Sequence, residues 1–502
     1  MLNYFKTDSR LWKKCIFVPE IPGIKMKLIN PLILARIISI ILLIESIAFL
    51  VCIPAALIYK EPSAPFILSS LVTFGLYILL RIAGNKADIN KAGTRDTYLA
   101  VTLSWIFLAV MGSLPYLFSG AIPGVINALF ESASGFTTTG ASILTNVEIL
   151  PYSILFWRSL THWIGGIGII VLVIIILPSL KVTGYQLFSL ESSLKEKIHS
   201  KTKGVAFRMV LIYLGLTAAE TILLYMGDMT LFDSLCHSFG TVATGGFSTK
   251  NNSLQFFSSY SQYIVMIFMF LSGTSMLIYY YLVKRNFRKV LHNEEFRFYL
   301  LTAFAAGAIA PLLLLPRAQT FEGAFREGYF QVISIMTCTG FASADYLLWP
   351  TAGMLLIFLM MFSGGSTGST SGGIKIARHL VVQKNIRSTI IKLTHPKALT
   401  PLRINSKVVN DPTKNSIVSF VILYIFLFFI GTIIVTVAGS DPVTSASSVA
   451  TCMAGIGPGL GTVGPMSNFA LMPQFSKVVL SILMIIGRLE IITVFVLFSK
   501  TF

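Results

Sequence analysis

Residues 135–142 read Gly-Phe-Thr-Thr-Thr-Gly-Ala-Ser, a string of small and hydroxylated residues that directly follows a short apolar segment. Three similar strings, at residues 241–248, 337–343 and 454–461, also follow short apolar segments. A helix needs about 20 apolar residues to cross a bilayer, and each of these segments is only about half that length. We therefore expect four re-entrant helices, each followed by a loop. The expected helices span residues 125–134, 231–240, 325–336 and 443–453.

A longer apolar segment precedes each short one, and another follows it. The preceding segments span residues 98–118, 205–226, 298–315 and 417–437. In the first two units, a predicted exit helix follows the string, at residues 152–177 and 263–283 respectively. Corresponding points of the four strings carry the anchor glycines Gly140, Gly245, Gly340 and Gly457. Similar intervals between these glycines indicate one structural unit used four times.

The composition identifies the class of protein. The 502-residue chain is 54% hydrophobic and 12% charged, whereas a soluble domain carries about 25% charged residues. Two further apolar helices, at residues 31–59 and 66–80, precede the first unit. We therefore predict an all-α polytopic membrane protein with four pseudo-fourfold helix–pore loop–helix repeats around a central pore, preceded by a two-helix N-terminal hairpin.

This organisation predicts six regions. The first region is expected to be a cytoplasmic leader, because it lacks the apolar core of a signal peptide. The two-helix hairpin follows this leader. The regions are the leader 1–30, the hairpin 31–95 and the four pore repeats 96–203, 204–293, 294–407 and 408–502.

The formal net charge of +18 is carried mainly by short connections between the apolar segments. Basic residues gather at 86–95, 181–203, 284–289 and 375–407. This asymmetry follows the positive-inside rule and places those connections in the cytoplasm. The spread of charge does not form the basic patch of a nucleic-acid-binding protein. On the opposite side we expect acidic residues that concentrate cations, namely Glu131, Asp233, Glu327 and Asp441.

The four strings predict an ion filter. Non-helical backbone at membrane depth is stable only where protein or an aqueous cavity surrounds it. Backbone carbonyls around an aqueous axis replace the hydration shell of a potassium ion, and glycine permits the positive φ angles that this geometry uses. The short helices end just before the strings, so their partly negative carboxyl ends favour a cation there.

The chain resembles the TrkH-type potassium uptake proteins of the TrkH/KtrB/HKT cation transporter superfamily. The resemblance rests on WRSLTHWIGGIGII at residues 157–170, on TTTGAS, ATGGFST, CTGFASADY and GIGPGLG in the four strings, and on GRLEI around Arg488. It implies potassium (K⁺) as the transported ion and a multi-pass protein of the plasma membrane. It also implies a homodimer docked on a cytoplasmic nucleotide-binding regulator of the TrkA type, so that any nucleotide acts only through that partner.

By the same resemblance, the ion contacts fall on the two residues before each anchor glycine. These residues are Thr138 and Thr139, Ala243 and Thr244, Cys338 and Thr339, and Gly455 and Ile456. The fourth string departs most from a threonine-rich pattern.

A second glycine-rich run, residues 363–373, interrupts the exit segment of the third unit. A helix cannot persist there, because each glycine costs about 1 kcal/mol relative to alanine. In the family this segment is the intramembrane gating loop, whose glycines here are Gly364, Gly365, Gly368, Gly372 and Gly373. Arg488 is expected either to bond to carbonyls of this loop and hold it closed, or to reach the inner surface or pair with Glu490.

Several alternatives remain open. An ion-coupled secondary transporter, linked to protons or sodium, also uses broken helices, and Glu45 and Glu220 are the acids nearest to the middle of a span. A less selective K⁺/Na⁺ channel is another alternative. We do not expect an enzyme, because the six histidines show no zinc-ligand spacing and no phosphate-binding P-loop is present. Residues 195–208 and 375–407 are candidate surfaces for the regulator or for anionic membrane lipids.

Overall fold

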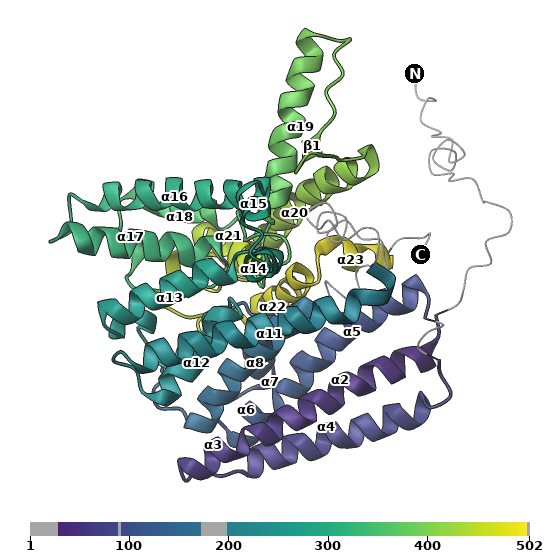
Figure 1. Cartoon of the computed structure of the whole chain (residues 1–502). Helices are drawn as coiled ribbons and strands as arrows, with labels where there is room; N and C mark the ends of the chain where they lie inside the picture. Colours follow the sequence, from purple (N-terminus) through teal and green to yellow (C-terminus); the bar gives the residue numbers. More distant parts are fainter. Residues whose placement is uncertain (1–28, 89–91, 172–197, 499–502) are drawn as a thin grey trace, which may run out of the picture.

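A computed structural model describes residues 29–88, 92–171 and 198–498. Figure 1 shows a bundle of helices, and the described residues contain a single small sheet, the antiparallel pair β1 (Arg403–Ile404) and β2 (Lys407–Val408). The predicted all-α class is therefore confirmed. Residues 1–28 of the predicted leader, the basic segment 181–197 and the end of the first exit helix, 172–177, lie outside the described residues.

The N-terminal hairpin consists of α2 (Pro31–Val51), α3 (Ile53–Ile58) and α4 (Ala64–Ala83). Asn30 caps α2 by accepting hydrogen bonds from the first backbone amides, and proline follows at the first helical position, both of which are favourable at a helix start. The hydroxyls of Ser46 and Ser70 lie 2.9 Å apart across the α2–α4 contact. Helix α2 also packs against α5 (Thr94–Gly112).

The first unit contains α5, α6 (Leu114–Ser119), the short helix α7 (Val125–Phe136) and α8 (Tyr152–Val171). In the second unit, α11 (Ile198–Tyr225) and the short helix α12 (Leu231–Val242) are followed by η3 (Ser253–Phe256), α13 (Ser259–Ser272) and α14 (Met276–Val283). The second unit closes with α15 (Phe287–Leu291). The third unit contains α16 (Glu294–Leu314), the short helix α17 (Phe321–Met336), η4 (Tyr346–Leu348), α18 (Thr351–Met360) and α19 (Ile376–Thr394).

The fourth unit contains α20 (Asp411–Val437), the short helix α21 (Pro442–Ala454), η5 (Gly461–Val463), α22 (Gln474–Arg488), α23 (Ile491–Phe495) and η6 (Val496–Phe498). Thr230, Thr320 and Asp441 cap the amino ends of α12, α17 and α21 through their side chains. The short helices also pack against exit helices of other units: α12 on α8, α17 on α13 and α7 on α22. This packing joins the units into one body (Figure 1).

The predicted single exit helix at residues 263–283 is wrong, because α13 and α14 meet at an angle of 94°. The break at Gly273–Ser275 receives the glycine-rich run of the third unit. The Gly273 carbonyl accepts a hydrogen bond from the Ser366 amide, and the Met276 amide donates to the Gly368 carbonyl. Backbone groups that a straight helix would pair internally are therefore used by another segment.

Among the described residues, six helices are long and apolar enough to cross a membrane, or up to seven if the bent pair counts as one span. Many of their side chains, such as Leu79 and Ile433, are apolar and exposed on the outside of the bundle. Such a surface is compatible with lipid and not with water. The predicted multi-pass membrane protein is thus confirmed.

Candidate functional site

The loops after the four short helices share one backbone conformation. In each loop, the first residue with positive φ comes just after the helix end, and a glycine with positive φ follows two positions later. The first set is Thr138 (52°), Thr244 (54°), Cys338 (57°) and Gly455 (71°). The second set is Gly140 (78°), Gly246 (78°), Gly340 (83°) and Gly457 (100°). Three residues of the first set carry a Cβ atom and still have positive φ, which is rare for residues other than glycine. This conformation is therefore a specific feature of the loops.

The predicted register of the second loop is wrong by one residue. Gly246 rather than Gly245 has the positive φ of the other anchor glycines. Backbone hydrogen bonds support this correction, because the intermediate residue of every loop donates to the carbonyl five residues earlier. These pairs are Thr139 to Ser134, Gly245 to Gly240, Thr339 to Ser334 and Ile456 to Thr451.

The predicted pair Ala243 and Thr244 is therefore replaced by Thr244 and Gly245. Ala243 ends α12 in the right-handed helical region, as Thr137 and Thr337 do in their helices. Gly245 is required for packing, because a Cβ atom there would collide with the imidazole ring of His162.

The four loops contact one another in a closed cycle. A Cβ atom on Gly140 would collide with the carbonyl oxygen of Gly245 in the second loop. The same relation joins Gly246 to Thr339, Gly340 to Ile456, and Gly457 back to Thr139. Each anchor glycine thus lies against the intermediate carbonyl of the next loop, and a larger residue would separate the two.

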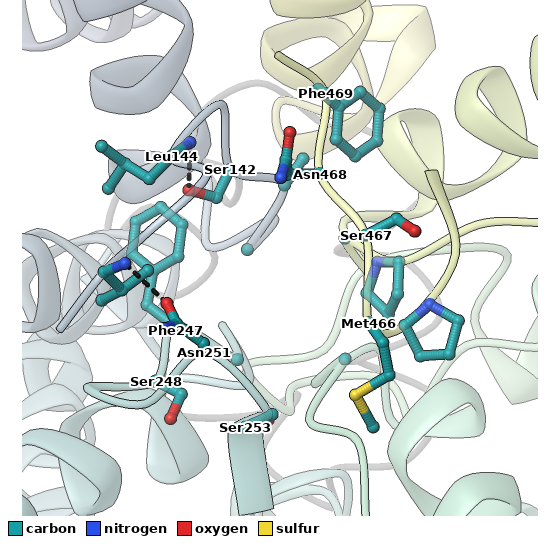
Figure 2. Close-up of a pocket in the computed structure, with 18 of the residues that line it drawn as sticks. Ser142, Leu144, Phe247, Ser248, Asn251, Ser253, Met466, Ser467, Asn468 and Phe469 are labelled. Atoms are coloured by element: carbon teal, nitrogen blue, oxygen red, sulfur yellow. Dashed lines mark hydrogen bonds between the residues drawn. The ribbon is translucent and has the colours of Figure 1, made fainter. Parts of the chain in front are cut away.

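All four glycines line one cavity of about 360 Å³. The remaining lining comes mainly from the segments that follow the first, second and fourth loops. Figure 2 shows the side chains of Ser142, Ser248, Asn251 and Asn468 around this cavity. Hydroxyl and amide groups of this kind are suited to a hydrated cation that approaches the ring of loops.

The carbonyl oxygens at the first and intermediate positions of the loops remain without hydrogen bonds. Within the described residues, no donor lies at the eight carbonyls of Thr138, Thr139, Thr244, Gly245, Cys338, Thr339, Gly455 and Ile456. By contrast, the carbonyl of Ala243 accepts a hydrogen bond from the Thr244 hydroxyl. A buried carbonyl without a partner is costly, so these oxygens are candidate ligands for an ion.

A buried ion pair supports the outer parts of the first two loops. Arg158 in α8 and Glu131 in α7 are 2% and 0% exposed, and their closest nitrogen and oxygen lie 2.8 Å apart. Glu131 also accepts hydrogen bonds from the hydroxyl of Ser142 and the amide of Ile143. The Arg158 guanidinium lies 4.0 Å from the centre of the Phe247 ring. The expectation that Glu131 attracts cations at the surface is therefore wrong.

The other three acids expected at the outer side also have structural contacts. Asp233 accepts hydrogen bonds from Thr230 and Thr249, and Glu327 accepts one from the Trp349 ring nitrogen at 2.6 Å. Asp441 caps α21, and the hydrogen bond from Thr444 holds the pKa of its carboxyl below the ordinary value. These acids position the short helices and their loops.

The glycine-rich run lies across the carboxyl ends of three short helices. The Thr370 hydroxyl donates to the Val242 carbonyl of α12 at 3.0 Å, and the Ser371 hydroxyl donates to the Thr337 carbonyl after α17 at 2.6 Å. A Cβ atom on Gly372 would collide with the carbonyl of Ala454 at the end of α21. Gly364, Gly368 and Gly373 have positive φ, whereas Gly365 packs against the Gly273 carbonyl.

Arg488 bonds to this run. It is 7% exposed, and one guanidinium nitrogen donates to the Thr370 carbonyl at 2.8 Å. A second nitrogen donates to the Gly165 carbonyl of α8 at 3.2 Å. Glu490, the partner in the alternative expectation, pairs with Arg378 at 2.6 Å. Of the two alternatives for Arg488, the structure contains the contact with the glycine-rich run.

Together, the ring of loops, the polar cavity and the apolar exterior define a helical membrane transport protein. A family model described as "TrkH: Cation transport protein" matches residues 68–502. The chain therefore belongs to the TrkH family of cation transport proteins.

Two named relatives and one solved structure agree with this assignment. The Trk system potassium uptake protein TrkH of Halomonas elongata is 34% identical, over 93% of this chain and 98% of that protein. TrkH of Escherichia coli K12 is 32% identical with the same coverage. The crystal structure of the potassium transporter TrkH from Vibrio parahaemolyticus matches with a TM-score of 0.85 and 29% identity, over 94% of this chain and 99% of that chain.

Replacement of Glu131 by Gln tests the buried ion pair. The change leaves the Arg158 charge buried without its counter-ion, so we expect the free energy of unfolding to fall by about 3–5 kcal/mol. Thermal unfolding of the purified protein in detergent measures the loss. Glu322→Gln is the matched control, because the exposed Arg326–Glu322 pair contributes at most about 1 kcal/mol. Equal stability of the two variants would contradict a supporting role for Glu131.

Proposed function

We propose that this chain takes up potassium ions across the plasma membrane, through a filter lined by backbone carbonyls. The observation that carries the proposal is the closed cycle of four loops whose carbonyl oxygens have no hydrogen-bond donor among the described residues. Dehydrated potassium requires several oxygen ligands of this kind. The printed names of the relatives, which are Trk potassium uptake proteins, support the choice of ion.

The proposed ligands are the eight unpaired carbonyls of the first and intermediate loop positions. They belong to Thr138 and Thr139, Thr244 and Gly245, Cys338 and Thr339, and Gly455 and Ile456. Because the ligand is the backbone, Ile456 and Gly455 serve as well as threonine. The carboxyl ends of α7, α12, α17 and α21 precede these loops, and their partial negative charge favours a cation.

A coupled transporter is the second candidate. Its support is the pair of buried carboxylic acids within spans, Glu45 in α2 and Glu220 in α11, which are 1% and 0% exposed. Neither acid lines the cavity above the loops, and the four loops are not needed for proton or sodium coupling. A passive filter accounts for more of the structure. A K⁺/Na⁺ channel of low selectivity uses the same filter and differs only in its ion preference.

We further propose that residues 363–373 form a gating loop that Arg488 holds closed. The loop reaches the ends of three short helices, where it obstructs the path below the filter. A cytoplasmic nucleotide-binding regulator of the TrkA type would open it. Exposed basic residues in the last turn of α19 and just after it, such as Lys392 and Lys397, offer a surface for that partner or for anionic lipid, and the functional unit is proposed to be a homodimer.

Replacement of Gly340 by Ala tests the filter. Its φ of 83° resists a Cβ atom, at a cost of about 1–2 kcal/mol, and the added methyl group collides with the Ile456 carbonyl. We expect the potassium flux into liposomes to fall by about tenfold or more, and the preference for potassium and rubidium over sodium to weaken. Gly215→Ala is the control, because a Cβ atom there meets nothing within 4 Å.

Unchanged flux and selectivity in Gly340→Ala would reject the filter. The same liposomes also separate a passive filter from a coupled transporter. Flux that requires a proton or sodium gradient would favour the coupled alternative.

Arg488→Ala tests the gate. Loss of its charge-assisted hydrogen bond to the Thr370 carbonyl, which is worth about 1.5–3 kcal/mol, releases the loop. We therefore expect regulator-free potassium flux to rise by about tenfold or more. A deletion within the glycine-rich run should also raise this flux. If both variants conduct as the unmodified chain does, residues 363–373 are not a gate.

A further inference from the structure

The amino end of α16 lies between the gating loop and a basic arm. We use "basic arm" for residues 376–410, which comprise α19, β1 and β2. Figure 1 shows α19 extending away from the helix bundle. The arm carries several lysines and arginines and no aspartate or glutamate, so a partner that binds it must present an acidic surface.

The basic arm holds Glu294 by two contacts. The side-chain oxygen of Asn405, in the turn between β1 and β2, accepts a hydrogen bond from the Glu294 amide at 2.8 Å. Lys384 of α19 forms an ion pair with the Glu294 carboxylate. Lys384 also donates to the Arg403 carbonyl at 2.8 Å, which joins α19, β1 and Glu294 at one point.

The next residue, Glu295, holds the gating loop. Its side chain is 2% exposed, and one carboxylate oxygen accepts a hydrogen bond from the Thr367 amide at 2.5 Å. Further along the loop, Arg488 and Lys375 donate to the carbonyls of Thr370 and Ser371. The loop is therefore held by a carboxylate acceptor at Thr367 and by two cations at Thr370 and Ser371.

Glu294 and Glu295 belong to the same rigid element. Both lie in the first turn of α16, which Asn293 caps through a hydrogen bond to the Phe296 amide at 2.8 Å. The backbone of consecutive residues in a capped first turn moves as one body, because the cap and the helical hydrogen bonds fix it. A displacement of Glu294 by the arm therefore displaces Glu295 relative to Thr367.

We propose that Glu295 is a positioning residue of the gate, and that Glu294 connects it to the basic arm. An acidic partner that moves the arm draws Glu295 away from the Thr367 amide and so loosens the loop. This inference rests on the proposed gating function of residues 363–373. It adds the route by which a partner on the arm reaches the gate.

The test compares regulator-free potassium flux into liposomes for a set of variants of the full chain. Glu295→Ala removes the acceptor, and we expect flux to rise by about tenfold, the effect of losing one charge-assisted hydrogen bond. Glu295→Gln keeps an amide oxygen that can accept, so its rise should be smaller. Lys384→Met should raise flux less than Glu295→Ala and should add nothing in the Glu295→Ala background, because Lys384 acts through Glu295.

Two matched changes complete the set. Lys414→Met is the control, because Lys414 forms an ion pair with Asp411 of α20, whereas Glu294 pairs with Lys384, and the flux of this variant should stay unchanged. Asn405→Gly removes the side chain that bonds to the Glu294 amide. Glycine adopts the positive φ of that position without strain. Asn405→Gly should raise flux to the same extent as Lys384→Met. It keeps the test decisive if size-exclusion chromatography shows that Glu295→Ala is not folded.

The outcomes distinguish this inference from the function on which it rests. If Arg488→Ala leaves flux unchanged as well, the gate itself is wrong. If Arg488→Ala raises flux while the variants of Glu295, Lys384 and Asn405 do not, only the present inference is overturned. An additive effect of Lys384→Met in the Glu295→Ala background would also overturn it, because the arm would then act by another route.

Discussion

A peptide group that leaves a helix inside a bilayer must find a partner, and the arrangement of this protein follows from that constraint. In each pore loop the amide at the intermediate position bonds back into its own short helix, as Thr139 does to Ser134. The positive φ angles on either side direct the neighbouring carbonyls away from that helix. Those carbonyls have no donor among the described residues, and the proposed partner is a cation or its water. The closed cycle of loops and the acids that anchor the short helices hold these oxygens in place.

The same constraint explains the gating loop. A run of glycines and serines at membrane depth has backbone groups that no helix satisfies, and here they bond to the broken helix pair α13–α14 and to the ends of the short helices. Those contacts hold the run across the carboxyl ends of three short helices, which is the proposed ion path. Arg488 and Glu295 add charge-assisted hydrogen bonds at Thr370 and Thr367 of the run. Such bonds are strong when intact and are lost by a shift of about an ångström, so the proposed closed state would be stable and still reversible.

Much of this architecture could be predicted from the sequence, because short apolar segments and glycine-rich strings are local signals. The helix class, the four loops and the contact of Arg488 with the glycine-rich run were all predictable from the sequence. The register of the second loop was not, since Gly245 and Gly246 are adjacent and only the packing of His162 and the third loop distinguishes them. The Glu131–Arg158 pair also required the fold, although an arginine within an apolar helix and an acid in the preceding short one were a usable signal. The break between α13 and α14 depends on a segment about ninety residues away, which no local pattern of residues 263–283 reveals.

The most direct test of the filter is an experimental structure determined with thallium(I) or rubidium in place of potassium, using anomalous scattering to locate the cations. The account predicts anomalous density on the axis of the four loops, within coordination distance of the carbonyl oxygens of Thr139, Gly245, Thr339 and Ile456. Cations found only elsewhere in the protein, with those oxygens bonded to protein donors, would contradict it.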